Sequence, residues 1–155
     1  MADHADTAAQ AAVVREIHIE ASPEIVFDYF TDPEKMTRWK GRSAELDPRP
    51  GGVYHVTMND VAAARGSYVE LDRPHRLVFT WGWEGGHPVA PGSSTVEVTL
   101  TPDAGGTLLR LVHTGLPDDQ REQHGEGWDL YMPRLAAAAA GRDPGPDPHA
   151  NPPQP

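Results

Sequence analysis

The amino-acid sequence predicts an α+β domain in which one curved antiparallel β-sheet surrounds a long C-terminal helix. Three observations lead to this fold class. Seven short segments have the residue pattern of strands, clusters of glycine and proline separate most of them, and a helical pattern over residues 117–140 follows the last one. A single curved sheet of this length buries its inner face only against such a helix.

The first strand is expected at residues 13–20, where Val13, Ile17 and Ile19 lie on one face of a pattern with period two. Two short helices are expected next. Ser22 and Asp32 each precede a proline and a glutamate, which is the pattern of an N-cap, a first helical position and an acidic first turn. We expect the second of these helices to end near Gly41.

Six further strands are expected between Ser43 and Thr114, separated by turn residues. After a first one that begins at Ser43, they cover residues 53–58, 65–71, 77–83, 95–101 and 107–114. Large apolar side chains share one face of residues 77–83, namely Leu77, Phe79, Trp81 and Trp83. In the last strand, one face carries Leu109, Leu111 and His113.

The long helix is expected over residues 117–140, beginning at the acidic pair that follows Pro117. Its buried stripe is expected to consist of Trp128, Tyr131 or Met132, Leu135 and Ala139. Pro133 lies inside this helix and removes a backbone donor, so we expect a bent or mobile helix.

Proline and glycine content divides the chain into three parts. Residues 1–12 lack an apolar stripe and are expected to form a flexible N-terminal tail, and residues 13–141 form the domain. Residues 142–155 are rich in proline and almost without apolar side chains, which cannot offset the entropy of ordering them. We therefore expect a disordered C-terminal tail.

The composition argues against several classes of function. The chain of 155 residues has a formal net charge of -10, which disfavours nucleic acid as a partner. It has no cysteine, no leader-like start and no apolar run long enough to span a membrane, so we expect a cytoplasmic protein. Its 8 histidines lack the spacing of zinc ligands, and neither a metal nor a cofactor is expected.

The chain has only two lysines, Lys35 and Lys40, and uses arginine at its other basic positions. This bias, together with the alanine, glycine and proline content, is typical of a GC-rich coding genome, and we expect a bacterial source.

Five segments together resemble one protein family. They are FTDPEKMTRWKG at 30–41, DPRPGGVYHV at 47–56, RPHRLVFTWGW at 73–83, GTLLRLVHTGLPDD at 106–119 and GEGWDLYMPRL at 125–135. In this order they resemble the activator of Hsp90 ATPase homologue (AHSA) family of the START-like, or SRPBCC, superfamily, which includes polyketide cyclase and Bet v-like proteins.

The resemblance implies a helix-grip fold, with a seven-stranded antiparallel sheet around the C-terminal helix and a deep apolar cavity between them. Eukaryotic co-chaperone members carry an additional N-terminal domain, so the chaperone role is not expected here. Bacterial members usually have a second aromatic residue where this chain has Lys40, which alters one wall of the expected cavity.

The expected ligand-contacting residues are mostly aromatic, and several are expected to converge on the space between sheet and helix. Aromatic rings offer contact area at low entropic cost, and methionine adapts its shape to a ligand. The same residues also fit a filled core, and both interpretations stay open. They are Trp39, Tyr54, Met58, Phe79, Trp81, Trp83, Leu111, His113, Trp128, Tyr131 and Met132.

His113 is the histidine whose strand parity directs it inward. As a neutral imidazole it is able to contact a ligand carbonyl or to transfer a proton, but a core histidine bonded to neighbouring groups fits the same pattern. The two interpretations lead to different functions for the domain.

Three functions fit these observations. The first is a module that binds a small hydrophobic molecule, such as a lipid, a polyketide or an aromatic metabolite. The second is a polyketide cyclase or aromatase in which His113 and Tyr131 orient a poly-carbonyl chain. The third is resistance by sequestration or self-sacrifice against a reactive natural product such as an enediyne, with Gly115, Gly125 and Gly127 beside the cavity. The sequence specifies neither the ligand nor the oligomeric state.

Overall fold

The computed structural model describes residues 12–148, which form one seven-stranded antiparallel sheet and three helices. The spatial order of the strands is β1-β7-β6-β5-β4-β3-β2. Their bounds are β1 Val13–Ile19, β2 Ser43–Leu46, β3 Val53–Thr57, β4 Ala63–Asp72, β5 Arg76–Trp81, β6 Ser94–Asp103 and β7 Gly106–Thr114. The sheet thus matches the predicted helix-grip fold.

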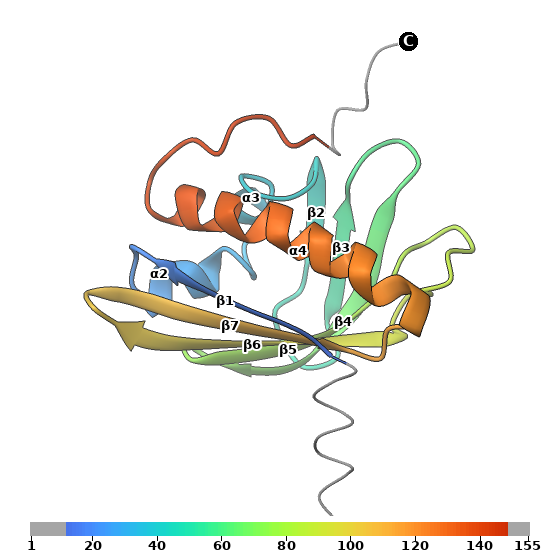
Figure 1. Cartoon of the computed structure of the whole chain (residues 1–155), viewed down its shortest axis with the longest axis horizontal. Helices are drawn as coiled ribbons and strands as arrows, with labels where there is room; N and C mark the ends of the chain where they lie inside the picture. Colours follow the sequence, from blue (N-terminus) through green and yellow to red (C-terminus); the bar gives the residue numbers. More distant parts are fainter. Residues whose placement is uncertain (1–11, 149–155) are drawn as a thin grey trace, which may run out of the picture.

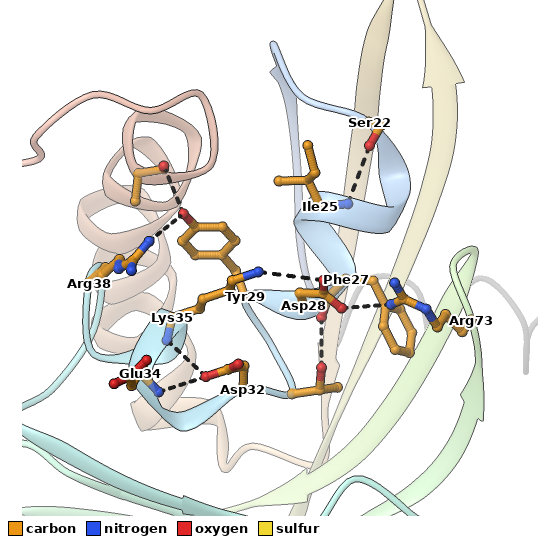
Figure 2. Close-up of polar contacts among 12 residues, drawn as sticks. Ser22, Ile25, Phe27, Asp28, Tyr29, Asp32, Glu34, Lys35, Arg38 and Arg73 are labelled. Atoms are coloured by element: carbon orange, nitrogen blue, oxygen red, sulfur yellow. Dashed lines mark hydrogen bonds and ion pairs between the residues drawn. The ribbon is translucent and has the colours of Figure 1, made fainter.

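Two short helices, α2 (Pro23–Asp28) and α3 (Pro33–Met36), follow β1 and begin at the predicted caps. The Ser22 hydroxyl accepts a hydrogen bond from the Ile25 amide, and the Asp32 carboxylate accepts from the amides of Glu34 and Lys35 (Figure 2). Each cap satisfies amides that a helix start leaves without an intrahelical partner.

The long helix α4 (Asp118–Ala139) crosses one face of the sheet, and α2 lies near its C-terminal end (Figure 1). Its buried face includes Trp128, Tyr131, Met132, Leu135 and Ala139, as the helical spacing predicts. Pro133 lies within the helix, which continues past it to Ala139.

Strand β5 ends at Trp81, two residues before the predicted end. A Cβ at Gly82 would lie 1.7 Å from the Ala90 carbonyl oxygen, so the connection to β6 folds back tightly over this position. Trp83 therefore lies outside the regular strand, in an isolated bridge with Ala64, and its side chain is half-buried.

The chain after α4 turns back and runs along the helix toward α3 and β2 (Figure 1). Arg134 on α4 donates hydrogen bonds to three successive backbone oxygens in this segment, those of Pro144, Gly145 and Pro146. Asp147 is buried, and its carboxylate accepts from the Gly41 amide at 2.8 Å and from the Tyr131 hydroxyl at 2.8 Å.

Residues 144–147, which lie within the predicted disordered tail, contact the domain through these polar bonds. Residues 149–155 of that predicted tail, and residues 1–11 of the predicted N-terminal tail, lie outside the described residues.

Candidate functional site

A cavity of about 490 Å³ lies between α4, the end of β5 and the connections that follow α3, β3 and β5. Apolar and aromatic side chains provide most of its surface, and six of the fourteen lining residues are polar or charged. The lining residues are Lys40, Met58, Asn59, Ala62, Trp81, Trp83, His87, Gln123, His124, Glu126, Gly127, Trp128, Leu130 and Tyr131. This volume lies within the range of sites for small molecules, roughly 300–1,000 Å³.

Lys40 enters this cavity from the turn that follows α3. The amide of Lys40 bonds to the Met36 carbonyl at 2.9 Å, and the carbonyl of Trp39 accepts from Arg134 at 3.0 Å. Gly41 has a φ of +83°, and a Cβ there would lie 2.6 Å from Val56 Cγ1. Glycine is therefore required after Lys40, and the backbone on both sides of the lysine is held in place.

The side chain of Lys40 is buried, with 4% of its surface exposed. Its Nζ lies 4.7 Å from the ring centroid of Trp128, 5.4 Å from that of Trp81 and 5.7 Å from that of Tyr131. Burial lowers the pKa of Lys40 from 10.5 to about 8, while the negative charge of Asp147 acts in the opposite direction. No hydrogen bond or ion pair involves this Nζ within residues 12–148.

His113 lies behind the cavity wall in a chain of hydrogen bonds. Trp128 Nε1 donates to His113 Nδ1 at 3.1 Å, so the ring proton belongs on Nε2, which faces Ser94 Oγ at 2.8 Å. The Ser94 hydroxyl donates to the Trp81 carbonyl at 2.7 Å. Both ring nitrogens of His113 are used, its exposure is 0%, and burial lowers its pKa to about 3.

His124, one turn before Trp128 on α4, makes a similar arrangement at the cavity surface. Trp83 Nε1 donates to His124 Nε2 at 3.1 Å, while His124 Nδ1 lies 2.7 Å from the Gln120 carbonyl and therefore carries the proton. Burial lowers the pKa of His124, although the bond to Gln120 opposes the shift. His87, from the loop after β5, lines the same side. The two Trp–His pairs fix the orientation of Trp83 and Trp128.

The model of one protein family, Activator of Hsp90 ATPase homolog 1-like protein, matches residues 20–140. The chain belongs to this family. An AHSA1-like protein of Rhizobium etli, solved by NMR, is 51% identical, with a TM-score of 0.71 and coverage of 88% of this chain and 86% of that chain. CalU16 from Micromonospora echinospora is 26% identical, with a TM-score of 0.67 and coverage of 83% and 76%.

A curated human relative, Activator of 90 kDa heat shock protein ATPase homolog 1, is 26% identical over 113 residues. The match covers 71% of this chain and 31% of the human protein, so the chain spans about a third of that relative's length. None of the described helices is long and apolar enough to cross a membrane.

Within this AHSA1-like domain, the predicted ligand-contacting residues divide into two groups. Met58, Trp81, Trp83, Trp128 and Tyr131 line the cavity. The others belong to the core or its hydrogen-bond network and do not line it, namely Trp39, Tyr54, Phe79, Leu111, His113 and Met132. Strand parity places the strand residues of both groups, such as Phe79, Trp81 and His113, on the inner face of the sheet, and the position of α4 decides which of them line the cavity.

The cavity-lining glycine is Gly127, where an added Cβ would meet no atom within 4 Å. Gly125 packs against the Arg15 guanidinium, and Gly115, at a φ of +82°, lies against Ser93 and Ser94. Of the three glycines in the self-sacrifice hypothesis, one therefore lies at the cavity.

The sequence places Lys40 at one wall of the expected cavity, but its patterns single out none of Lys40, His87 and His124 as a ligand-contacting residue, and all three line the cavity. Lys40 could have been recognised in the sequence because it directly follows Trp39 and is one of only two lysines in the chain. For His124, it was the spacing of four residues from Trp128, which places both side chains on one face of a helix.

Proposed function

We propose that this domain binds a small, largely apolar molecule in the cavity between the sheet and α4. The observation that carries the proposal is the cavity itself, which combines a volume of about 490 Å³ with three tryptophan side chains in its wall. Tryptophan rings provide large rigid contact area, so a planar or flexible apolar ligand gains burial there at little entropic cost.

The polar groups at the cavity support an amphipathic ligand with one polar end. Lys40 supplies the ammonium group among the lining residues, whereas Trp83 and Trp128 already donate their ring N–H groups to histidines. A ligand therefore meets apolar surface over most of its length and a hydrogen-bond donor at Lys40.

The cyclase hypothesis receives less support from this geometry than the binding hypothesis. It assigned proton transfer to His113 and Tyr131, yet His113 does not line the cavity and both of its ring nitrogens already have partners. We therefore propose binding alone. The heat-shock ATPase role in the name of the human relative is not extended to this domain.

The test uses 2-naphthalenemethanol, an apolar aromatic alcohol, as the probe, with native mass spectrometry for stoichiometry and titration calorimetry for affinity. A complex of one probe per chain is expected. If the full chain shows no saturable binding of the probe up to the probe's solubility limit, the proposal is overturned.

Two methionines form a matched pair for locating the site. Met58 and Met36 are both almost fully buried, but Met58 lines the cavity and Met36 does not. Met→Ala at either position removes a similar core contact and is expected to cost about 2–5 kcal/mol of stability. Only Met58→Ala is expected to change the affinity for the probe. Equal affinities for the two variants, measured below their unfolding temperatures, place the ligand elsewhere.

A further inference from the structure

Lys40 is a buried amine, and among the described residues its Nζ forms neither a hydrogen bond nor an ion pair. Three aromatic rings surround its Nζ at 4.7 to 5.7 Å, and no hydrogen bond or ion pair reaches it within residues 12–148. Moving a charged ammonium out of water costs free energy. Among the described residues, no ion pair at Nζ offsets this cost. The site therefore favours a neutral amine more than water does.

A second lysine, in the preceding helix α3, provides the contrast. Lys35 is partly exposed, and its Nζ reaches toward α2, where it lies 3.6 Å from Asp28 Oδ2 (Figure 2). Its amine is therefore in contact with both solvent and a carboxylate. The chain thus holds one ordinary lysine and one desolvated lysine, five positions apart.

We propose that Lys40 captures aldehydes or ketones covalently, forming a reversible imine with an apolar carbonyl compound bound in the cavity. The neutral Nζ attacks the carbonyl carbon, and one amine proton moves to the former carbonyl oxygen to give a carbinolamine. Loss of the hydroxyl group and the second amine proton as water forms the C=N bond, and addition of water reverses the reaction.

Three features of the site favour this chemistry over simple recognition of an anion. Amines buried among apolar groups stay neutral more often and are the form that attacks carbonyl carbon. The pKa of Lys40, about 8, gives a neutral fraction at pH 7 that is about two orders of magnitude larger than that of an ordinary lysine. Asp147 and Glu126 bring negative charge to the surroundings, which disfavours an anionic ligand.

Proton carriers lie beside the amine. Tyr131 lines the cavity, its ring centroid is 5.7 Å from Lys40 Nζ, and its hydroxyl donates to Asp147 at 2.8 Å. A hydroxyl bonded to a carboxylate is able to relay the proton that leaves the amine, and water in the cavity completes the path. The aromatic wall selects an apolar carbonyl compound, so this inference rests on the proposed binding of a small apolar molecule.

The experiment incubates the full chain with 2-naphthaldehyde and sodium cyanoborohydride, which reduces an imine to a stable secondary amine. Peptide mapping by mass spectrometry then compares naphthylmethyl labelling of Lys40 with that of Lys35 and of the N-terminal amine. Labelling of Lys40 is expected to exceed that of Lys35 by on the order of tenfold or more, because a desolvated amine is more often neutral. In concentrated urea this preference is expected to vanish.

Two variants complete the design. Lys35→Arg leaves Lys40 as the single lysine and is expected to retain full labelling there, whereas Lys40→Met, with its fold checked by circular dichroism, is expected to lose the preferred label. Equal labelling of Lys35 and Lys40 in the folded protein overturns the inference. If 2-naphthalenemethanol binds but 2-naphthaldehyde leaves Lys40 unlabelled, the covalent step fails while the proposed function stands. If the alcohol does not bind, the proposed function fails separately.

Discussion

The burial of Lys40 leads to a stability prediction whose sign depends on pH. The folded state holds this group at a pKa of about 8, compared with 10.5 in the unfolded chain. Keeping the proton on folded Lys40 at neutral pH therefore costs about 3 kcal/mol of stability. The cation–π contacts offset a part of this cost. Lys40→Met removes the charge and keeps an apolar side chain of similar length. We expect the variant to be more stable than the wild type by about 1–3 kcal/mol at pH 7.

This difference is expected to shrink as the pH rises. Between pH 8 and pH 10.5 the unfolded chain binds more protons at Lys40 than the folded chain does, so the wild type gains stability with increasing pH. The gain amounts to about 2 kcal/mol between about pH 8 and pH 10. Burial also raises the pKa of Tyr54, Tyr68 and Tyr131, which lowers stability in more alkaline solution, but both proteins retain these tyrosines and their effect cancels.

Urea unfolding followed by circular dichroism, at several pH values across this range, measures the free energy of unfolding of both proteins. Lys35→Met is the control, because it removes the other lysine from a partly exposed position with a carboxylate nearby. The reasoning is refuted if Lys40→Met is less stable than the wild type at neutral pH, or if the difference between them does not change with pH.

Two further predictions concern residues around the cavity. His113→Phe keeps a ring but leaves Trp128 Nε1 without an acceptor and removes one bond to Ser94, so urea unfolding should show a loss of about 1–3 kcal/mol at neutral pH. The pKa of His113 is about 3 in the folded protein, compared with its ordinary 6.5, so the unfolded chain binds a proton there first as the pH falls from 6.5 to 3. The wild type therefore loses stability over this range, and its difference in unfolding free energy from His113→Phe should narrow. A difference that does not change with pH contradicts a neutral His113. Gly41→Ala and Gly51→Ala both place alanine at a positive φ, +83° and +84°, but only at Gly41 does the Cβ also clash with its neighbours. Thermal unfolding should show a loss of about 1 kcal/mol for Gly51→Ala and clearly more for Gly41→Ala, and equal losses would contradict the tight turn after Lys40.

The order of the elements along the chain could be predicted from local patterns. Alternation in β1 and β7, the proline-containing caps of α2 and α3, and the helical stripe through Trp128 and Leu135 each depend on residues close together in the sequence. Seven strands and one long helix then leave few ways to bury the apolar faces, and the helix-grip fold is the one observed.

The division between cavity and core could not be predicted in the same way. Phe79 and Trp81 lie two residues apart on the same face of β5, yet only Trp81 reaches the cavity. His113 has the inward parity that the sequence indicated, but its role depends on Ser94 and Trp128, which come from β6 and α4. Alternation specifies the face of a sheet, whereas the depth of a cavity depends on where the opposing helix lies.

Local patterns were enough to predict the fold class, because strand and helix periodicity and capping act over a few residues and leave few arrangements of the apolar faces. Only the tertiary structure brought Lys40 beneath three aromatic rings and Asp147 to the same place from the far end of the described chain. The energetic environment of a charged group depends on everything packed around it, whatever the distance along the chain. The chemistry of the site was therefore decided by packing between distant segments.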